Sequence, residues 1–188
     1  MEFLSLRGKD IRFCIGCLSC QKTGSCVLKD DVPEIMTKVK EAEVVVFATP
    51  IYYYEMSGQM KTLLDRLNPL YDSDYCFRDI YMIATAAEDE STTIEKAYNG
   101  LQGWVDCFER ATLKGYVFGG GINDAGEAVQ HAEAMRQAIQ PWAECVKDET
   151  THFFTAQHAD TACRHRLRRE ENRPRNTGYP GRLSRRNV

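Results

Sequence analysis

The run EAEVVVFATP, which begins at Glu41, constrains the fold of this chain more than any other stretch. Residues 44–47 are three valines and a phenylalanine without alternation, and Pro50 follows shortly after them. A continuous β-branched run of this kind predicts a strand buried on both faces. Strands of that type are typical of a parallel sheet, whose crossover connections cover it with helices.

Helical patterns alternate with further strand-like segments along the chain. Three more strands are predicted, at residues 2–6 (EFLSL), Asp79 to Ala87, and Ala111 to Gly121. Helices are predicted over residues 30–42 with Asp30 or Asp31 as N-cap, 57–67 capped by Ser57, 91–110, and 128–146 with an interruption at Pro141. This order predicts an α/β protein with a doubly wound parallel sheet and helices on both faces.

Composition separates a globular body from a different C-terminal segment. With 188 residues and 43% hydrophobic content, one domain is expected, and we place it at residues 1–147. Residues 148–188 contain nine arginines and no lysine, have few aliphatic side chains, and are expected to be a disordered tail. Phosphate contacts from such a tail would suit nucleic acid, but the body has no basic face to extend them, which disfavours that interpretation.

The chain is also expected to be cytoplasmic and without a membrane partner. No apolar run approaches the roughly 20 residues that cross a bilayer, and the N-terminus is charged where a signal peptide would be apolar.

The loop TPIYYYEMSGQMK follows the most apolar strand and enters a helix at Ser57. In doubly wound sheets, ligands bind outside the carboxyl ends of the strands, so this loop and the segments 86–90 and 119–123 are candidate binding loops. Three consecutive tyrosines offer a flat wall with polar tips, which suits a planar heteroaromatic ring. Alternatively, the tyrosines cap the core or form a dimer surface.

Four of the eight cysteines lie within thirteen residues, in the spacing C-x2-C-x2-C-x5-C. They are Cys14, Cys17, Cys20 and Cys26. Three thiolates on one tight loop with a fourth returning nearby are a workable set of ligands for a [4Fe-4S] cluster. Redox-active or unligated thiols, a zinc site and disulfides are the alternatives.

The stretch from the cysteine loop through EVVVFATPIYYYEMSGQMKTLLDRL resembles the flavodoxin-like NAD(P)H-dependent FMN reductase family, including its iron-sulfur flavoproteins, over about residues 2–137. The resemblance implies FMN, a nicotinamide substrate, an electron acceptor and a homo-oligomer. It implies hydride transfer to the flavin and onward electron transfer, and no side chain is assigned as a catalytic acid or base. The implied cofactor-binding residues are Pro50, Ile51, Tyr52, Tyr53, Tyr54, Met56, Ser57, Thr85, Ala86, Ala87 and Glu88. The cysteine spacing matches the motif of the iron-sulfur flavoproteins.

The beginning of the chain departs from the family pattern. Its first residues correspond to the family's second strand, so the first strand and the phosphate-binding loop are expected to be missing by truncation. The glycine run from Gly119 is weighed as a replacement phosphate cradle against an ordinary turn. The alternative to an enzyme is a non-catalytic flavodoxin-like remnant, or a binding subunit that needs a partner to complete its sheet.

Overall fold

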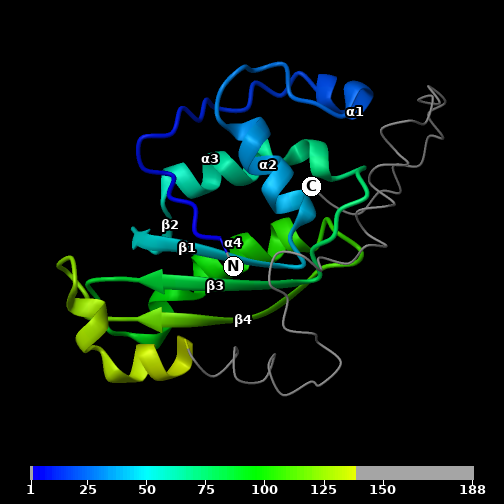
Figure 1. The fold of residues 1–188 in the computed structure, drawn as a ribbon. Helices are drawn as coiled ribbons and strands as arrows, with labels where there is room; N and C mark the ends of the chain where they lie inside the picture. Colours follow the sequence, from blue (N-terminus) through cyan, green and yellow to red (C-terminus); the bar gives the residue numbers. More distant parts are fainter. Residues whose placement is uncertain (1, 139–188) are drawn as a thin grey trace.

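The computed structural model describes residues 2–138 and contains a four-stranded, mostly parallel sheet (Figure 1). Strands β1 (Val44–Tyr52), β3 (Asp79–Thr85) and β4 (Thr112–Gly119) are parallel neighbours, and the short β2 (Glu55–Met56) pairs antiparallel with the end of β1. The order is β2-β1-β3-β4. The α/β class with a parallel sheet, predicted from the alternation of strands and helices, is therefore confirmed.

The helices connect these strands. The longer ones are α2 (Val32–Glu41), α3 (Gly58–Arg66) and α4 (Glu95–Val105), and the short ones are α1 (Ser19–Thr23), η1 (Asn68–Leu70), η2 (Ser91–Ile94) and η3 (Glu127–Gln130). Ser57 caps α3 as predicted, since its Oγ accepts a hydrogen bond from the Met60 amide at 3.3 Å. The helix predicted over residues 91–110 is shorter, because it opens as a 3-10 turn and ends at Val105.

One core lies between the sheet and these helices. Phe47 of β1 and Met82 of β3 are buried there together with residues of α2, α3 and α4. Trp104 of α4 meets the Phe47 ring edge-on at 5.6 Å between centroids, and its Nε1 donates to the Leu64 carbonyl at 3.2 Å. This aromatic contact and hydrogen bond join α4 to β1 and to α3.

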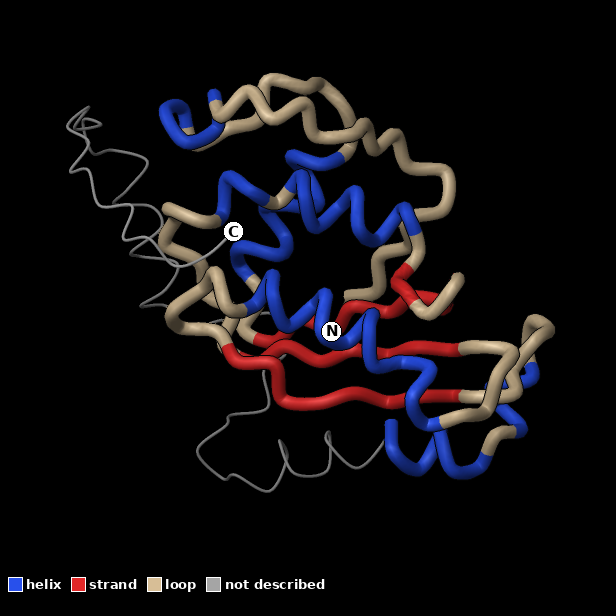
Figure 2. The backbone as a smooth tube through the Cα atoms, turned by 180° about the vertical axis from the view of Figure 1, so that it is seen from behind, coloured by secondary structure: helices blue, strands red, loops and turns tan. Residues whose placement is uncertain are grey.

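The second face of the sheet carries residues 132–138, which are helical and lie on the opposite side of the sheet from α4 (Figures 1 and 2). Ala134 of this segment and Val117 of β4 are both buried, outside the main core. The remainder of the helix predicted over 128–146, including Pro141, lies outside the described residues, as do the domain boundary at residue 147 and the segment 148–188.

Two local predictions were wrong. Residues 2–6 form no strand: Leu4 and Leu6 pack against the core, but no strand within residues 2–138 pairs with this segment. Strand β1 is not buried on both faces: Phe47 is buried, whereas Ala48 is exposed. The reason is that α2, α3 and α4 all contribute to the core on the Phe47 face, which leaves the other face of β1 open.

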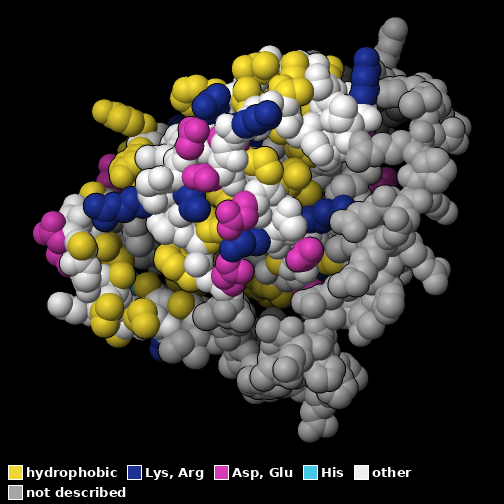
Figure 3. All heavy atoms as spheres, turned by 45° about the horizontal axis from the view of Figure 1, so that its top comes forward, with side chains coloured by type: hydrophobic (Ala, Val, Ile, Leu, Met, Phe, Trp, Pro, Cys, Tyr) yellow, Lys and Arg dark blue, Asp and Glu magenta, His cyan; other side chains and the backbone are white. Residues whose placement is uncertain are grey.

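The face of the molecule seen in Figure 3 mixes acidic and basic side chains with hydrophobic ones. It shows no continuous stripe of Lys and Arg over the described residues.

Candidate functional site

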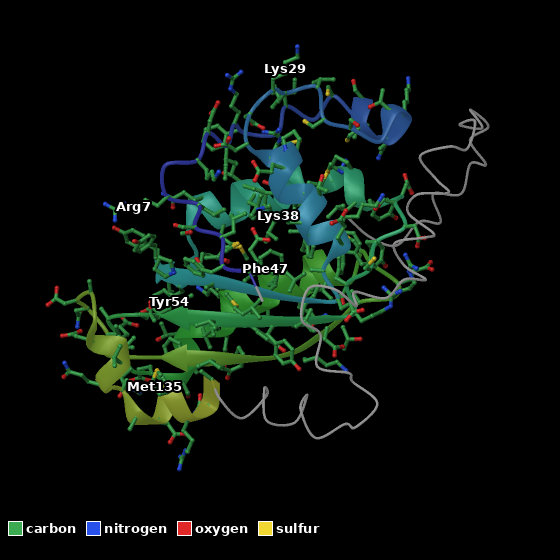
Figure 4. The ribbon with its side chains drawn as sticks, in the orientation of Figure 1. Arg7, Lys29, Lys38, Phe47, Tyr54 and Met135 are labelled. Carbon is green, nitrogen blue, oxygen red and sulfur yellow. The ribbon has the colours of Figure 1, made fainter. Side chains whose placement is uncertain are left out.

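The three parallel strands end at a common edge. Pro50 of β1 is the register partner of Thr85 of β3, and Thr85 is the partner of Gly119 of β4. The loops predicted to bind a ligand therefore leave the sheet side by side. Figure 4 shows Tyr54 at this edge, beside the tips of the strand arrows.

The tyrosines form a strained hairpin between β1 and β2. Ile51 pairs with Met56 and Tyr52 with Glu55, so Tyr53 and Tyr54 are the two turn residues. Their φ angles are 52° and 67°, in the left-handed region, as in the tight turns that usually employ Asn-Gly. Strain of about 1–3 kcal/mol per residue persists only where the surroundings impose it, and it is concentrated at functional sites.

The two turn tyrosines differ: Tyr53 is exposed to solvent, and Tyr54 is hydrogen-bonded to the neighbouring loop. Tyr53 is 98% exposed, whereas the Tyr54 hydroxyl donates to Glu88 Oε1 at 3.2 Å. That hydrogen bond to Glu88 raises the pKa of Tyr54, because the carboxylate favours the protonated phenol. Lys96 Nζ lies 5.3 Å from the Tyr54 ring centroid, and Thr93 Oγ1 donates to Glu88 Oε2 at 3.3 Å. The loops after β1 and β3 are thus joined by the Tyr54–Glu88 hydrogen bond.

The predicted cofactor residues divide into a surface set and a buried set. Exposed are Pro50, Tyr52, Tyr53, Tyr54, Ala87 and Glu88, with Thr85 half-buried, whereas Ile51, Met56, Ser57 and Ala86 are buried. The buried set supports the loops and offers no side-chain surface to a ligand.

Thr49 is a buried supporting residue that the sequence analysis missed. Its Oγ1 accepts a hydrogen bond from the Ser57 amide at 2.9 Å, which fixes the start of α3 against β1. A threonine at the end of an apolar strand run was the available signal, but strand propensity alone accounts for it.

The glycine run after β4 packs against the loop after β3. Ala86 donates its amide hydrogen to the Gly119 carbonyl at 3.0 Å, and its own carbonyl accepts from the Ile122 amide at 2.9 Å. A Cβ atom at Gly120 would lie only 2.6 Å from Asp89 Cα. Glycine is therefore needed for close packing beside a carboxylate, and this favours the ordinary turn over a phosphate cradle.

The edge suits the ring of a flavin. Tyr52 and Tyr53 provide exposed aromatic surface. The first turn of α3 begins here, and its exposed residues Gly58 and Gln59 carry amide hydrogens that the helix itself does not use. Aromatic surface together with free helix N-terminal amides fits a planar, hydrogen-bonding ring.

The cysteine loop lies at the other end of α3. Cys14 and Cys17 are exposed, Cys20 and Cys26 are half-buried, and all four are free thiols. The Ser19 backbone amide lowers the pKa of the Cys17 thiol by hydrogen bonding. The preceding turn is strained, since Leu18 has a φ of 54°.

The donor set of the loop fits a thiolate-bound centre. Asn68 Nδ2 donates to Cys20 Sγ at 3.1 Å, as expected for a residue that orients a sulfur ligand. Within residues 2–138, however, no three Cys, His, Asp or Glu side chains lie close enough together to hold a metal ion. A cluster would therefore require Cys14 and Cys17 to move toward the half-buried pair.

Arg66 and Asp30 form a buried ion pair beneath this loop, which the sequence analysis missed. Both side chains are 0% exposed, Arg66 Nη1 lies 2.5 Å from Asp30 Oδ2, and Nη2 lies 3.1 Å from Oδ1. Asp30 and Asp31 were both candidate N-caps. Asp31 occupies the N-cap position of α2 without a side-chain cap bond, and the Asp30 Oδ1 accepts from the Val32 amide at 3.2 Å. Its second role depends on a partner 36 residues away, for which the sequence offers no local signal.

Helix α3 separates the two candidate sites. It begins beside Ser57 at the tyrosine edge and ends at Arg66 beneath the cysteine loop. A nine-residue helix is about 13 Å long. The cysteines therefore lie one helix length from the edge that suits a flavin.

The parallel sheet, with its binding loops predicted at the carboxyl ends of the strands, is typical of a flavodoxin-like protein. A family model described as NADPH-dependent FMN reductase matches residues 1–132, and the chain belongs to that family. The family assignment and the flavodoxin-like class expected from the sequence are confirmed.

Curated relatives agree with this assignment. An iron-sulfur flavoprotein of Methanocaldococcus jannaschii is 45% identical over 69 residues, which cover 37% of this chain and 36% of that protein. A Bacillus subtilis protein named as a putative NAD(P)H-dependent FMN-containing oxidoreductase is 26% identical over 121 residues, which cover 59% of this chain and 65% of that protein. The chain spans about a third of the length of the iron-sulfur flavoproteins that it matches, with 36% and 31% of two of them covered.

Solved structures show the same fold. The Trp repressor binding protein of Bacillus subtilis has a TM-score of 0.50 at 26% identity, covering 57% of this chain and 73% of that one. The azoreductase AzrA has a TM-score of 0.55 at 14% identity, covering 75% and 80%, and shows likeness of fold alone. Among the described helices, none has the length and apolar character required to cross a membrane.

Proposed function

We propose that this chain is part of an NAD(P)H-dependent oxidoreductase that binds FMN at the carboxyl edge of its sheet. The observation that carries the proposal is the strained tyrosine hairpin, which is hydrogen-bonded through Tyr54 to Glu88 on the neighbouring loop. Family membership and the oxidoreductase among the relatives support the same chemistry.

Each group at the edge has a distinct role in this proposal. FMN, when bound, accepts a hydride from the nicotinamide and passes electrons to a small-molecule or protein acceptor. Tyr52 and Tyr53 provide the wall for its ring, and the amides of Gly58 and Gln59 provide hydrogen bonds. Glu88 accepts the hydrogen bond of the Tyr54 hydroxyl and so joins the hairpin to the loop after β3. Pro50, Thr85 and Ala87 keep their proposed contact with the cofactor, whereas the buried Ile51, Met56, Ser57 and Ala86 are proposed to support the binding loops.

FMN titration followed by visible spectroscopy tests the proposal. The wild-type chain should bind FMN, and NAD(P)H should bleach the flavin absorbance. Replacing Tyr53→Ala removes one aromatic contact of about 0.5–1.5 kcal/mol and should weaken FMN binding roughly 2- to 12-fold. Tyr71→Ala is the matched control, because Tyr71 is 54% exposed and follows η1 rather than the hairpin.

A wild-type chain without FMN affinity would overturn the proposed function. FMN binding that the Tyr53 and Tyr71 variants weaken equally would overturn the tyrosine site alone.

We further propose that Cys14, Cys17, Cys20 and Cys26 hold a [4Fe-4S] cluster that exchanges electrons with the flavin. The four free thiols, the hydrogen bond from Asn68 to Cys20 Sγ, and the iron-sulfur flavoproteins among the relatives support it. Anaerobic reconstitution should yield a brown protein with about four irons per chain. Replacing Cys17→Ser should remove iron and colour together, and full iron retention in that variant would contradict the assignment.

A second candidate function is a binding subunit that completes its sheet with a partner strand. The observation in its favour is the outer edge of β1, which pairs with β2 only at Ile51 and Tyr52 within the described residues. Size-exclusion chromatography with light scattering would detect a homo-oligomer, which we also propose. A stable, FMN-free oligomer would favour this candidate over the enzyme.

A cytoplasmic location is part of the main proposal, because the loop cysteines have to stay reduced to bind iron.

A further inference from the structure

The end of α3 and the start of η1 contact the cysteine loop at three separate points. Arg66 Nη1 donates to the Arg12 carbonyl at 2.7 Å and pairs with Asp30, so it binds the loop just before its first cysteine and just after its last. Asn68 donates to Cys20 Sγ in the middle of the loop. We propose that Arg66 and Asn68 are positioning residues: Arg66 holds the base of the cysteine loop and Asn68 orients the Cys20 thiol, so that only the exposed Cys14 and Cys17 have to move when metal binds. This inference rests on the proposed cysteine centre.

Arg66 closes the loop at its base. The Arg12 amide donates to Asp30 Oδ2 at 3.1 Å, and the Asp31 amide donates to the Asp10 carbonyl at 3.0 Å. Together with the guanidinium, these bonds join the strand-like segment before the cysteines to the start of α2. Closing the loop in advance removes conformational entropy that metal binding would otherwise have to offset.

The guanidinium also has unused hydrogen-bonding capacity. Arg66 is only 1% exposed, and its buried Nε has no hydrogen-bond partner among the described residues. The bonds that hold the loop therefore come from its Nη atoms, which reach Arg12 and Asp30.

Asn68 acts on the sulfur itself. It is half-buried at the start of η1, and the following Pro69 and Leu70 are buried, so its backbone is held by the core. A hydrogen bond to a ligand sulfur fixes its orientation and adjusts the reduction potential of a bound cluster. Replacing residues of this kind typically weakens metal affinity about 10- to 100-fold.

The test uses the full chain, Co²⁺ as the metal probe, and matched pairs of variants. Asn68→Leu removes the donor to Cys20, and Asn99→Leu is its control on the exposed surface of α4. Arg66→Lys keeps the charge but removes the forked guanidinium, whose Nη atoms bond to both Arg12 and Asp30. Arg110→Lys is its control, since Arg110 pairs with Asp74 at 2.8 Å. Thermal melts verify that each variant is folded before its metal affinity is interpreted.

Two measurements separate this inference from the proposal on which it rests. Titration of the sulfur-to-cobalt charge-transfer band should show about 10- to 100-fold weaker Co²⁺ binding in Asn68→Leu than in Asn99→Leu. Tryptic cleavage at the exposed Lys22 in the metal-free protein should be several-fold faster in the Asn68 variant.

Each outcome decides one of the two ideas. If Asn68→Leu matches Asn99→Leu in both cobalt affinity and cleavage rate, the positioning role is wrong. If the wild-type chain shows no sulfur-to-cobalt band, the proposed cysteine centre is wrong, and Arg66 and Asn68 do not position metal ligands. Faster cleavage of the Asn68 variant would then show only that Asn68 anchors the loop. Arg66→Lys should weaken cobalt binding while Arg110→Lys does not, and equal affinities would remove Arg66 from the proposal.

Discussion

The buried pair of Asp30 and Arg66 should make the substitution Asp30→Asn strongly destabilising. Both side chains are 0% exposed, and the carboxylate meets the guanidinium at 2.5 Å and 3.1 Å. Asparagine keeps the shape but removes the charge, which leaves the guanidinium buried and uncompensated. Breaking a buried pair by removing one partner costs about 3–5 kcal/mol.

Urea unfolding followed by circular dichroism measures this loss. With a slope of about 2 kcal/mol per molar urea, the midpoint should fall by roughly 2 M. The matched control is Asp65→Asn, whose partner Lys61 Nζ lies 2.6 Å away at the surface, with side chains 59% and 48% exposed. Because solvent screens that pair, its loss should cost less than about 1 kcal/mol.

The same pair predicts a pH dependence. Burial raises the pKa of Asp30, but hydrogen bonds from Arg66 and from two backbone amides outweigh burial and lower the pKa overall. A carboxylate with a lowered folded pKa stabilises the protein above its unfolded value of about 3.9, and this stabilisation is lost as the pH falls further. The difference in unfolding free energy between wild type and Asp30→Asn should therefore narrow below about pH 4. A loss no larger than that of Asp65→Asn, or a difference independent of pH, would refute the reasoning.

Three further substitutions test the packing around the candidate sites. Gly120→Ala places a methyl group against the loop after β3 and should lower both the melting temperature and FMN affinity. Its control is Gly103→Ala, which has open space on α4 and should stabilise the protein by up to about 1 kcal/mol. Calorimetry measures the melting temperatures of both variants. Thr49→Val leaves the buried Ser57 amide without its acceptor and should cost about 1–3 kcal/mol in urea, while Thr49→Ser should retain most of the stability. Phe77 is 0% exposed, and its ring contacts those of Trp104 and Phe108. Phe77→Ala should cost about 3–5 kcal/mol, and a loss below about 1 kcal/mol would show that the neighbouring rings collapse into the space.

The sequence by itself determined the elements and their class. Apolar runs and helical spacing located β1, β3 and β4, and Ser57 as N-cap located the start of α3. These signals are local. Propensity, periodicity and capping act within a few residues, so they can be recognised in the sequence without knowing the fold. The rule that ligands gather at the carboxyl ends of parallel strands then placed the tyrosine loop beside the loop after β3.

Other features depended on pairings between distant residues. Residues 2–6 have strand-like character but form no strand, because a strand exists only where a neighbour supplies its hydrogen bonds. Tyr53 and Tyr54 adopt left-handed conformations that their residue type disfavours, since the hairpin register with β2 imposes them.

The largest difference between prediction and structure concerns Asp30. It was predicted only as a candidate helix cap, but it also pairs with Arg66 beneath the cysteine loop. The sequence determined that four cysteines lie close together along the chain. Only the tertiary structure decided that the Asp30–Arg66 pair holds their loop. A buried charge needs an opposite charge beside it, and which residue lies there depends on the fold and not on separation in sequence.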